Sequence, residues 1–390
     1  MHTRTWGAHR AEFSLDPSWT FLNHGSFGAT PRAVQAVRRG WLDRMEAQPV
    51  QFLARELPEL LHEARAPLAR FLGTSPDQLA FVGNATTGIA AVLGSLTLGA
   101  GDVLLTTDHR YNAVFQALQA TAHRAGASVE CLSVGASGIA RRADLLQRLE
   151  DRLRTGPRPR LLVISQITSP TAICMPVEQV CALARRHGVA VLVDGAHAPG
   201  QITVELDTLG ADYWVGNLHK WLCAPKGTAL LWARSALLPT VHCPQISHGR
   251  GQGFHQEFDW PGTFDPSAWL SAPAALAQHE AWGGPDLRAA HHELAQIGLQ
   301  TLLDEVDGLS PVCAPDSDAY AAMATVRLPL PASAAFPLMA VLRRHRIEVP
   351  VQPWWDSAWL RISAFAAHNR PEQYAELAAV LPAAMADVRD

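Results

Sequence analysis

Residues 189–197 read VAVLVDGAH, a continuous apolar run that ends in an acid and a glycine. The preceding residues 176–187 begin with proline and end at Gly188, as an amphipathic helix does. Another apolar run, residues 161–165, comes before that helix. Strand, helix and strand in this order, with continuous apolar strands, predict a parallel sheet covered by helices on both faces.

The alternation of apolar runs and helical patterns continues toward the N-terminus. Residues 102–107 are expected to form a buried strand, and residues 113–124 a helix that Gly126 closes. After about residue 265 the pattern changes to a mostly helical stretch, residues 272–306. We therefore predict an α/β fold followed by a smaller α+β region.

The domain boundaries follow from this change of pattern. Residues 21–270 are expected to form a large domain with a mostly parallel sheet and helices on both faces. Residues 271–390 are expected to form a small C-terminal α+β domain, with short strands at residues 324–328 and 359–363. Residues 1–20 are expected to pack with the small domain.

The composition argues against several classes of protein. The 390 residues are 48% hydrophobic, and 32 basic residues nearly balance 36 acidic ones, so no nucleic-acid or anionic-membrane partner is expected. No apolar run is long enough to span a bilayer, and residues 1–13 do not resemble a signal peptide. The expectation is a cytoplasmic protein. The six cysteines match no metal motif, and no metal site is predicted.

Lysine is rare in this chain, and its rarity points to a role. Lys220 and Lys226 are the only lysines among the 32 Lys and Arg residues. Nucleotide composition alone can produce such a bias toward arginine. Where only charge matters, however, arginine serves as well, whereas lysine can supply a neutral amine. The two lysines are therefore candidates for covalent chemistry.

A carboxylate and an imidazole precede these lysines. Asp194 ends a predicted parallel strand, where ligands of such sheets bind, and His197 follows three residues later. Lys220 lies 26 residues after Asp194, in Gly-Asn-Leu-His-Lys-Trp. Each residue alone has an ordinary structural explanation, such as a turn cap for Asp194. Together, their order and spacing match the needs of pyridoxal phosphate (PLP).

PLP needs a lysine amine that forms an imine with its aldehyde, and a carboxylate that faces its pyridine nitrogen. Its phosphate is usually bound at a helix N-terminus. Residues 84–88, NATTG, precede an apolar helix and could bind phosphate or form an ordinary N-cap. Residues 107–112 follow a strand end, so a ring there could cover the PLP ring, with a buried structural tyrosine as the alternative.

The sequence resembles the fold-type I PLP enzymes of the aminotransferase class V superfamily, which includes cysteine desulfurases and isopenicillin N epimerase. The resemblance runs from FLNHGSFG at residues 21–28 to WLRIS at residues 359–363, almost the whole chain. Within this superfamily the sequence is most similar to the isopenicillin N epimerase-like branch, as its motifs LNHGSFG, DGAH, NLHKWL and VPV indicate. The resemblance implies that residues 21–270 bind PLP and that a homodimer shares its active sites.

The resemblance also implies roles for individual residues. Lys220 would hold PLP as a Schiff base and move the Cα proton of an amino-acid substrate. Asp194 would pair with the pyridine nitrogen, and His197 would donate to the phenolic oxygen of PLP. Arg361 would bind the substrate α-carboxylate through two parallel N–H groups.

Further implied contacts concern the ring, the phosphate and the neighbouring subunit. Tyr111 would stack on the PLP ring, although His109 or Arg110 could do so instead. Thr263, in Trp-Pro-Gly-Thr, would reach the phosphate of the neighbouring subunit. The phosphate contacts within the subunit would be Ala85, Thr86, Thr87, Asn217 and His219.

Some residues near the implied site have two possible roles. Asn23 and His24 would line the substrate entrance, but a simple turn would have the same sequence. Lys226 would lie at the surface or on the phosphate side of the site. Trp354 and Trp355 would either line a substrate pocket or pack in the small domain.

The cofactor alone does not determine the reaction, because the geometry of the pocket selects the bond that breaks. The resemblance favours an epimerase or racemase, with Lys220 as base on one face of Cα and His24, His109 or Tyr111 on the other. A C–S β-lyase acting on a cysteine conjugate needs only Lys220 and a leaving group. Simple transamination is a third alternative.

Three other classes are disfavoured. Cysteine desulfurases use a thiolate shortly before the carboxylate-binding arginine, and residues 314–361 contain no cysteine. No G-x-G-x-x-G motif follows an early strand, which argues against a nicotinamide-binding protein. A PLP-binding regulator without turnover would not need every catalytic position filled, and no DNA-binding module is attached.

Overall fold

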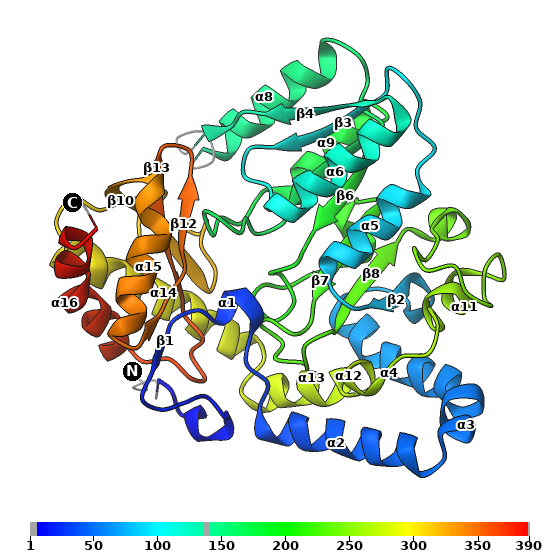
Figure 1. The fold of residues 1–390 in the computed structure, drawn as a ribbon. Helices are drawn as coiled ribbons and strands as arrows, with labels where there is room; N and C mark the ends of the chain where they lie inside the picture. Colours follow the sequence, from blue (N-terminus) through cyan, green and yellow to red (C-terminus); the bar gives the residue numbers. More distant parts are fainter. Residues whose placement is uncertain (1–5, 136–140, 389–390) are drawn as a thin grey trace.

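The computed structural model describes residues 6–135 and 141–388, and its centre is a seven-stranded sheet (Figure 1). The strands lie in the order β2 (Leu79–Val82), β8 (Ala229–Ala233), β7 (Tyr213–Asn217), β6 (Ala190–Asp194), β5 (Leu161–Ser165), β3 (Val103–Thr107) and β4 (Ser128–Leu132). From β7 to β4 neighbouring strands are parallel, whereas β8 is antiparallel to both of its neighbours. The predicted α/β fold with a mostly parallel sheet is confirmed.

Helices cover both faces of this sheet. They are α5 (Ala85–Ser95) and α6 (Asn112–Ala125) on one face, and α4 (Leu57–Phe71), α8 (Arg142–Arg154) and α9 (Val177–Arg186) on the other. On β5, Leu161 and Val163 belong to the core with α5 and α6, while Leu162 and Ile164 belong to the core with the other three. Because successive strand residues point to opposite faces, a continuous apolar run is what this arrangement requires.

The elements predicted around residues 189–197 are confirmed. β5 has the predicted bounds, and β6 ends at Asp194 as predicted while beginning one residue later. α9 follows Pro176, and α6 ends at Gly126, which has a left-handed φ of 69°. The strand ends are therefore placed as the sequence predicts.

A second, antiparallel sheet lies in the C-terminal part of the chain. Its strands are ordered β12 (Val351–Trp354), β13 (Ser357–Ser363), β10 (Met323–Pro331) and β9 (Ser310–Pro311). The helices of this part are α13 (Ala272–Ala281), α14 (Pro285–Glu305), α15 (Ala335–Arg344) and α16 (Glu372–Ala386). The strands expected at residues 324–328 and 359–363 are confirmed within β10 and β13, while the division at residue 270 stays a prediction.

The N-terminal segment contacts this C-terminal part. β1 (Thr20–Phe21) pairs in parallel with β11 (Ile347–Glu348), and the N–H of Gly7 donates to the carbonyl of Ala366 at 3.0 Å. Residues 1–5, part of the predicted N-terminal segment, lie outside the described residues.

Helix α1 (His24–Phe27) brings the N-terminal segment against the loop that carries Lys220, between the two larger sheets (Figure 1). Gly28 has a φ of 67°, and a Cβ atom there would collide with the carbonyl oxygens of His219 and Lys220. Glycine permits both the backbone conformation and this close approach.

The remaining elements connect these layers. They are α2 (Arg32–Ala47), α3 (Pro49–Gln51), α10 (Leu206–Leu209), α11 (Phe254–Phe258), α12 (Ser267–Leu270), a π-helical turn at Phe52–Glu56, and 3₁₀ turns at Arg10–Glu12, Pro76–Gln78, Ser235–Thr240 and Ala332–Ala334. In residues 6–135 and 141–388, no helix has both the length and the apolar composition that a membrane span requires.

Candidate functional site

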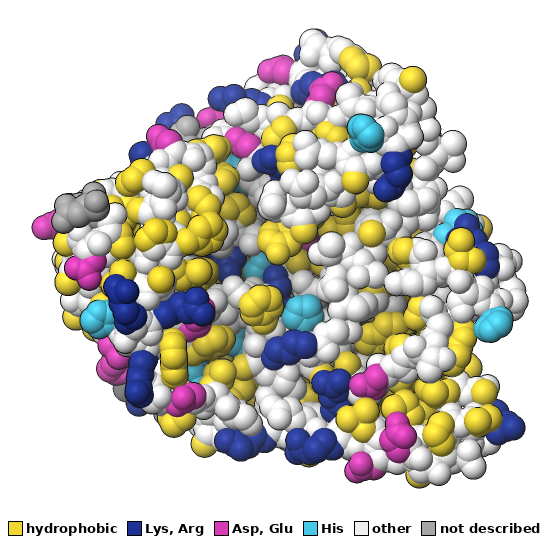
Figure 2. All heavy atoms as spheres, in the orientation of Figure 1, with side chains coloured by type: hydrophobic (Ala, Val, Ile, Leu, Met, Phe, Trp, Pro, Cys, Tyr) yellow, Lys and Arg dark blue, Asp and Glu magenta, His cyan; other side chains and the backbone are white. Residues whose placement is uncertain are grey.

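A cleft of about 350 Å³ opens at the carboxyl ends of β6 and β7, beside the N-terminus of α5. Figure 2 shows a hollow near the centre of one face, in which Lys or Arg and His side chains lie. The cleft brings together many of the predicted site residues, namely Ala85, Thr86, Tyr111, Asp194, His197, Asn217, His219 and Lys220. Its walls also contain Ser26, Phe27 and Ser169, which the sequence did not single out.

Lys220 presents its amine to an imidazole in this cleft. Its Nζ atom is 3.2 Å from Nε2 of His197. Burial, and then the charge of Arg361, lower the pKa of Lys220 to about 7, while the charge of Asp194 opposes this shift. A large share of the amine is therefore neutral near pH 7, which is the form that attacks an aldehyde.

His197 is a neutral ring at the same pH. Burial and the charge of Lys220 lower its pKa well below the ordinary value. The indole Nε1–H of Trp221 lies 3.5 Å from Nδ1 and donates to it, which leaves the ring proton on Nε2. Nε2 therefore faces Lys220 as a hydrogen-bond donor, and the imidazole orients the neutral amine.

Asp194 ends β6 as a buried carboxylate with 5% of its surface exposed. Its Oδ1 atom accepts the N–H of Ala196 at 3.0 Å. Burial raises the pKa of Asp194, whereas this hydrogen bond and the charge of Lys220 oppose the rise. A carboxylate in this environment gains from a cationic N–H partner, such as a protonated pyridine nitrogen.

The support behind Asp194 was not predicted. The N–H of Gln166 donates to the carbonyl of Asp194 at 2.8 Å, and the Gln166 side chain accepts the indole N–H of Trp214 at 2.9 Å. A Cβ atom at Gly195 or Gly216 would collide with that indole. Only glycine at both positions lets a buried tryptophan pack here, but a single sequence does not reveal which side chain requires them.

The N-terminus of α5 faces the cleft through Ala85 and Thr86. The N-cap Asn84 accepts the N–H of Thr87 at 2.9 Å, so Thr87 belongs to the cap and is not among the lining residues. The N–H of Ala85 donates to Oδ1 of Asn217 at 2.9 Å, which joins the helix to the end of β7. A helix N-terminus in this position suits an anion such as a phosphate.

His219 lies beside this helix end. Its Nδ1 atom is 3.1 Å from the carbonyl of Thr228 and donates to it. Burial, and then the charge of Lys220, lower the pKa of His219 to about 4. Lys226, which had two possible roles, also lines the cleft, and burial lowers its pKa.

Arg361 reaches the same region from β13. It is 2% exposed, and Nη1 donates to the carbonyl and the hydroxyl of Ser169 at 2.7 and 3.2 Å. Nη2 donates to the hydroxyl of Ser26 at 3.4 Å. Among the described residues Nε is buried without a partner and no carboxylate pairs with the guanidinium. Burial lowers the pKa of Arg361 to about 10, so an incoming carboxylate would relieve an uncompensated charge.

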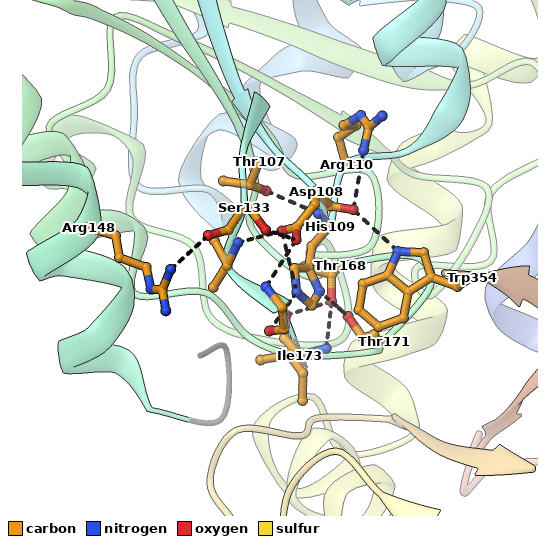
Figure 3. A network of polar contacts seen from close by, with 12 residues as sticks. Thr107, Asp108, His109, Arg110, Ser133, Arg148, Thr168, Thr171, Ile173 and Trp354 are labelled. Atoms are coloured by element: carbon orange, nitrogen blue, oxygen red, sulfur yellow. Dashed lines mark hydrogen bonds and ion pairs between the residues drawn. The ribbon is translucent and has the colours of Figure 1, made fainter. Parts of the chain in front are cut away.

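The structure separates the three candidates for covering the PLP ring. Tyr111 lines the cleft and is 49% exposed. His109 is buried in a polar network and does not line the cleft (Figure 3). The guanidinium of Arg110 lies 3.9 Å from the ring centroid of Phe115. Tyr111 is thus the candidate whose side chain faces the cleft.

Besides Thr87 and Arg361, three predicted residues are not among those that line the cleft. Asn23 and His24 were expected at the substrate entrance, but the nearby Ser26 and Phe27 line the cleft instead. His24 stacks on Phe365 at 4.1 Å, and burial lowers its pKa to about 3. Thr263 lies outside the cleft of its own chain.

The groups of the cleft fit PLP. Lys220 offers a neutral amine for the aldehyde, and Asp194 offers a buried carboxylate that accepts the uncharged N–H of Ala196 and has no ion pair among the described residues. The helix end at Ala85 and Thr86 offers backbone donors for the phosphate, and Tyr111 offers an exposed ring. These are the four features that the chemistry of the cofactor requires.

Comparisons with known proteins agree with this fit. Residues 28–350 match the family model described as aminotransferase class-V. Isopenicillin N epimerase of Amycolatopsis lactamdurans is 33% identical over 383 residues, which cover 93% of this chain and 94% of that protein. The Arabidopsis thaliana protein named "Probable L-cysteine desulfhydrase, chloroplastic" is 31% identical over 400 residues, covering 94% of this chain and 83% of that protein.

Solved structures share the fold. C-DES with glycine covalently linked to its PLP cofactor superposes with a TM-score of 0.81 at 22% identity, covering 95% of this chain and 98% of that one. At this level of identity the likeness shows the fold alone. The fold-type I architecture expected from the sequence is therefore confirmed.

Proposed function

The chain belongs to the aminotransferase class-V family and is a PLP-dependent enzyme, and we propose that it uses Lys220 to remove the Cα proton of an amino acid. The observation that carries this proposal is the 3.2 Å contact between Nζ of Lys220 and Nε2 of His197. When bound, PLP supplies an electron sink that stabilises negative charge at Cα. A base beside that sink is what proton removal requires.

Lys220 is suited to be this base. Burial and the charge of Arg361 keep much of its amine neutral near pH 7, because its pKa lies at about 7. A base works best when its pKa is close to the working pH. His197 orients the amine through its Nε2–H, and Asp194 holds the pyridine nitrogen of the cofactor protonated in this proposal.

Arg361 supports an α-amino acid as the substrate class. Its guanidinium is buried, lacks a carboxylate partner among the described residues, and rests on Ser169 and Ser26, which line the cleft. A planar guanidinium binds a carboxylate through two parallel hydrogen bonds. In this proposal the α-carboxylate binds Arg361 and thereby fixes Cα relative to Lys220.

Epimerisation is the first candidate outcome. It needs a second proton-transferring group on the face of Cα opposite Lys220. Of the three candidates from the sequence, His24 and His109 are buried away from the cleft, and Tyr111 lines it. Tyr111 is therefore our candidate for the second group, and the likeness to isopenicillin N epimerases supports this outcome.

β-Elimination from a cysteine conjugate is the second candidate. It is favoured by the fact that Lys220 alone provides the base it needs, and by the likeness to a protein named as an L-cysteine desulfhydrase. A persulfide-forming reaction has less support. No cysteine lines the cleft within the described part of the chain, and Cys313 is buried, with its pKa raised by that burial.

A homodimer is part of the proposal. Thr263 does not reach the cleft of its own chain, which is consistent with a contact to the cofactor phosphate of a second copy. Sedimentation of the PLP-loaded enzyme tests this directly: a dimer is expected, and a monomer at micromolar concentration would contradict it. The variant Thr263→Val should weaken PLP binding without changing the dimer.

The reaction is tested by incubating the PLP-loaded enzyme in deuterated water with L- and D-amino acids and cysteine conjugates. Deuterium at Cα with loss of chirality would establish epimerisation, whereas pyruvate and ammonia would establish β-elimination. Retention of the Cα proton in every compound would overturn the proposal. Tyr111→Phe tests the two faces of Cα separately. The variant should no longer invert the configuration at Cα, while Lys220 should still exchange the Cα proton for deuterium with retention of configuration.

A further inference from the structure

His109 joins two walls of the cleft without lining it. It is fully buried and hydrogen-bonds the loops that follow β4 and β5, while its own loop follows β3 (Figure 3). We propose that His109 is a positioning residue that sets Tyr111 and Arg361 in their places. This inference rests on the function proposed above for those two residues.

The hydrogen-bond partners of His109 determine which of its ring nitrogens carries the proton. Nε2 is 3.2 Å from the carbonyl of Gly135, which can only accept, so Nε2 carries the ring proton. Nδ1 then accepts the hydroxyl proton of Thr171, 2.9 Å away. The Thr171 oxygen accepts in turn from the hydroxyl of Thr168 at 2.7 Å, which itself accepts the N–H of Ile173 at 2.9 Å. One tautomer of neutral histidine satisfies the whole chain of bonds.

One arm of this network fixes the loop that carries Tyr111, two residues after His109. The N–H of His109 lies 3.3 Å from the hydroxyl of Thr107 and donates to it. The neighbouring Asp108 carboxylate accepts the N–H groups of Val134 and Gly135, each at 3.0 Å. The backbone on the N-terminal side of Tyr111 is thus held, although the phenol itself is half exposed.

The other arm leads to Arg361 by two routes. Thr171 lies two residues after Ser169, whose carbonyl accepts the shortest hydrogen bond of Arg361, at 2.7 Å. On the other side, the ring of Trp354 meets the His109 ring edge-on at 4.5 Å, and its indole N–H donates to the carbonyl of Asp108 at 3.3 Å. Trp354 ends β12, which pairs with β13, the strand of Arg361.

Three of the four groups that fit the cofactor lie outside this network, and Tyr111 is the exception. Lys220, Asp194 and the N-terminus of α5 have none of their hydrogen bonds with His109 or Thr171. Loss of His109 should therefore leave the attachment of PLP to Lys220 intact while it disturbs the binding and the orientation of the substrate. A residue that merely fills the core would not separate these two effects.

The test compares His109→Phe, which fills the space but removes the ring partner of Thr171 and of the Gly135 carbonyl, with His109→Gln, which keeps one donor and one acceptor. His109→Phe should raise KM for the amino acid about tenfold, as expected when buried polar groups lose their partner. The absorption of PLP attached to Lys220 should persist, because Lys220 and Asp194 have no hydrogen bond with His109. His109→Gln should recover part of the loss, and Thr171→Val should act in the same direction without adding to it.

His368→Phe is the matched control. His368 is also buried, its pKa is likewise lowered to about 4 by burial, and its ring meets those of Phe13 and Phe21 edge-on, outside the cleft. This variant should change the unfolding temperature but not KM. If His109→Phe also changes only the unfolding temperature, the inference is wrong.

A spectroscopic test needs no turnover. Nitrogen NMR of the PLP-free protein should show His109 as the neutral Nε2–H tautomer at pH 7, because the carbonyl of Gly135 requires a proton on Nε2 and burial lowers the pKa of His109 to about 4; a charged ring or the other tautomer would overturn the inference. Arg361→Ala distinguishes the proposed function of Arg361 from the positioning role of His109. If it leaves KM unchanged, the proposed function of Arg361 fails; if it raises KM and His109→Phe does not, the positioning role fails.

Discussion

The charge of Arg361 helps to keep Lys220 neutral, because after burial it is the largest cause that lowers the pKa of the lysine to about 7. Arg361 itself has no carboxylate partner among the described residues. A substrate carboxylate bound there would cancel its charge. The pKa of Lys220 should then rise, so that the lysine becomes a stronger base when the substrate is in place.

The pH dependence of cofactor attachment tests this relationship. In the PLP-free enzyme the neutral form of Lys220 reacts with the aldehyde, and the pKa of about 7 is lowered from an ordinary value of 10.5. The rate of attachment, followed by absorbance, should rise with pH through about 7 and then level off. A rate that still climbs steeply above pH 9 would contradict the lowered pKa.

Arg361→Gln provides the internal control for that profile. Removing the positive charge takes away a cause that lowers the pKa of Lys220, so the profile should move to higher pH. His345→Gln, at an exposed residue, should leave the profile where it is. If the profile of Arg361→Gln does not move, burial alone accounts for the lowered pKa of the Lys220 amine.

The assignment of the covalent lysine is tested by comparing the two lysines of the chain. Lys220→Arg keeps the charge but cannot form an imine, so the visible absorption of bound PLP should disappear and turnover should fall by about 10²–10⁴-fold. Lys226→Arg should keep the covalent attachment. Borohydride reduction followed by peptide mass analysis should place the label on Lys220, and a label on Lys226 would contradict the assignment.

Substrate anchoring is tested with Arg361→Lys, which preserves a positive charge but loses the two-pronged geometry. KM for the amino acid should rise by about 10–100-fold, as expected for a charge-assisted pair, while the PLP spectrum stays intact. Esters of the same amino acids, which lack the carboxylate, should lose this sensitivity. Parallel loss of PLP binding would show that Arg361 belongs to the cofactor contacts instead.

The strand ends were predictable because they depend on local patterns. A continuous apolar run that ends in Asp194, preceded by a helix bounded by Pro176 and Gly188, reflects burial on both faces of a parallel sheet. The N-terminus of α5 was visible in the same way, as an N-cap motif at residues 84–88.

The residues whose places could not be read from the sequence depend on contacts across the fold. His24 looks like an entrance residue in the sequence, yet it stacks on Phe365, more than 300 positions away. Ser169 gives no local signal, since its carbonyl matters only because Arg361 arrives from β13. His109 was a candidate for the ring, and only the bonds to loops after β4 and β5 show that it faces away from the cleft.

Buried neutral histidines should make the protein sensitive to acid. Burial lowers the pKa of His24 to about 3 and the pKa of His279 to about 4, from 6.5. In the unfolded chain these rings take up protons below about pH 6.5, while in the folded protein they do not. Their contribution to stability is therefore fully present above pH 6.5 and is lost as the pH falls toward 4 and then 3.

Urea unfolding of the PLP-free protein between pH 7 and pH 5 measures this loss. Each such histidine should lower the free energy of unfolding by ~1.4 kcal/mol per pH unit below about pH 6.5. His279→Phe should flatten the dependence by that amount, and it should do little harm at pH 7 because Nδ1 of His279 is already buried without a partner in the described structure. His345→Phe, at an exposed position, should leave the slope unchanged. An equal slope in wild type and His279→Phe would show that this ring takes up its proton in the folded state as readily as in the unfolded chain.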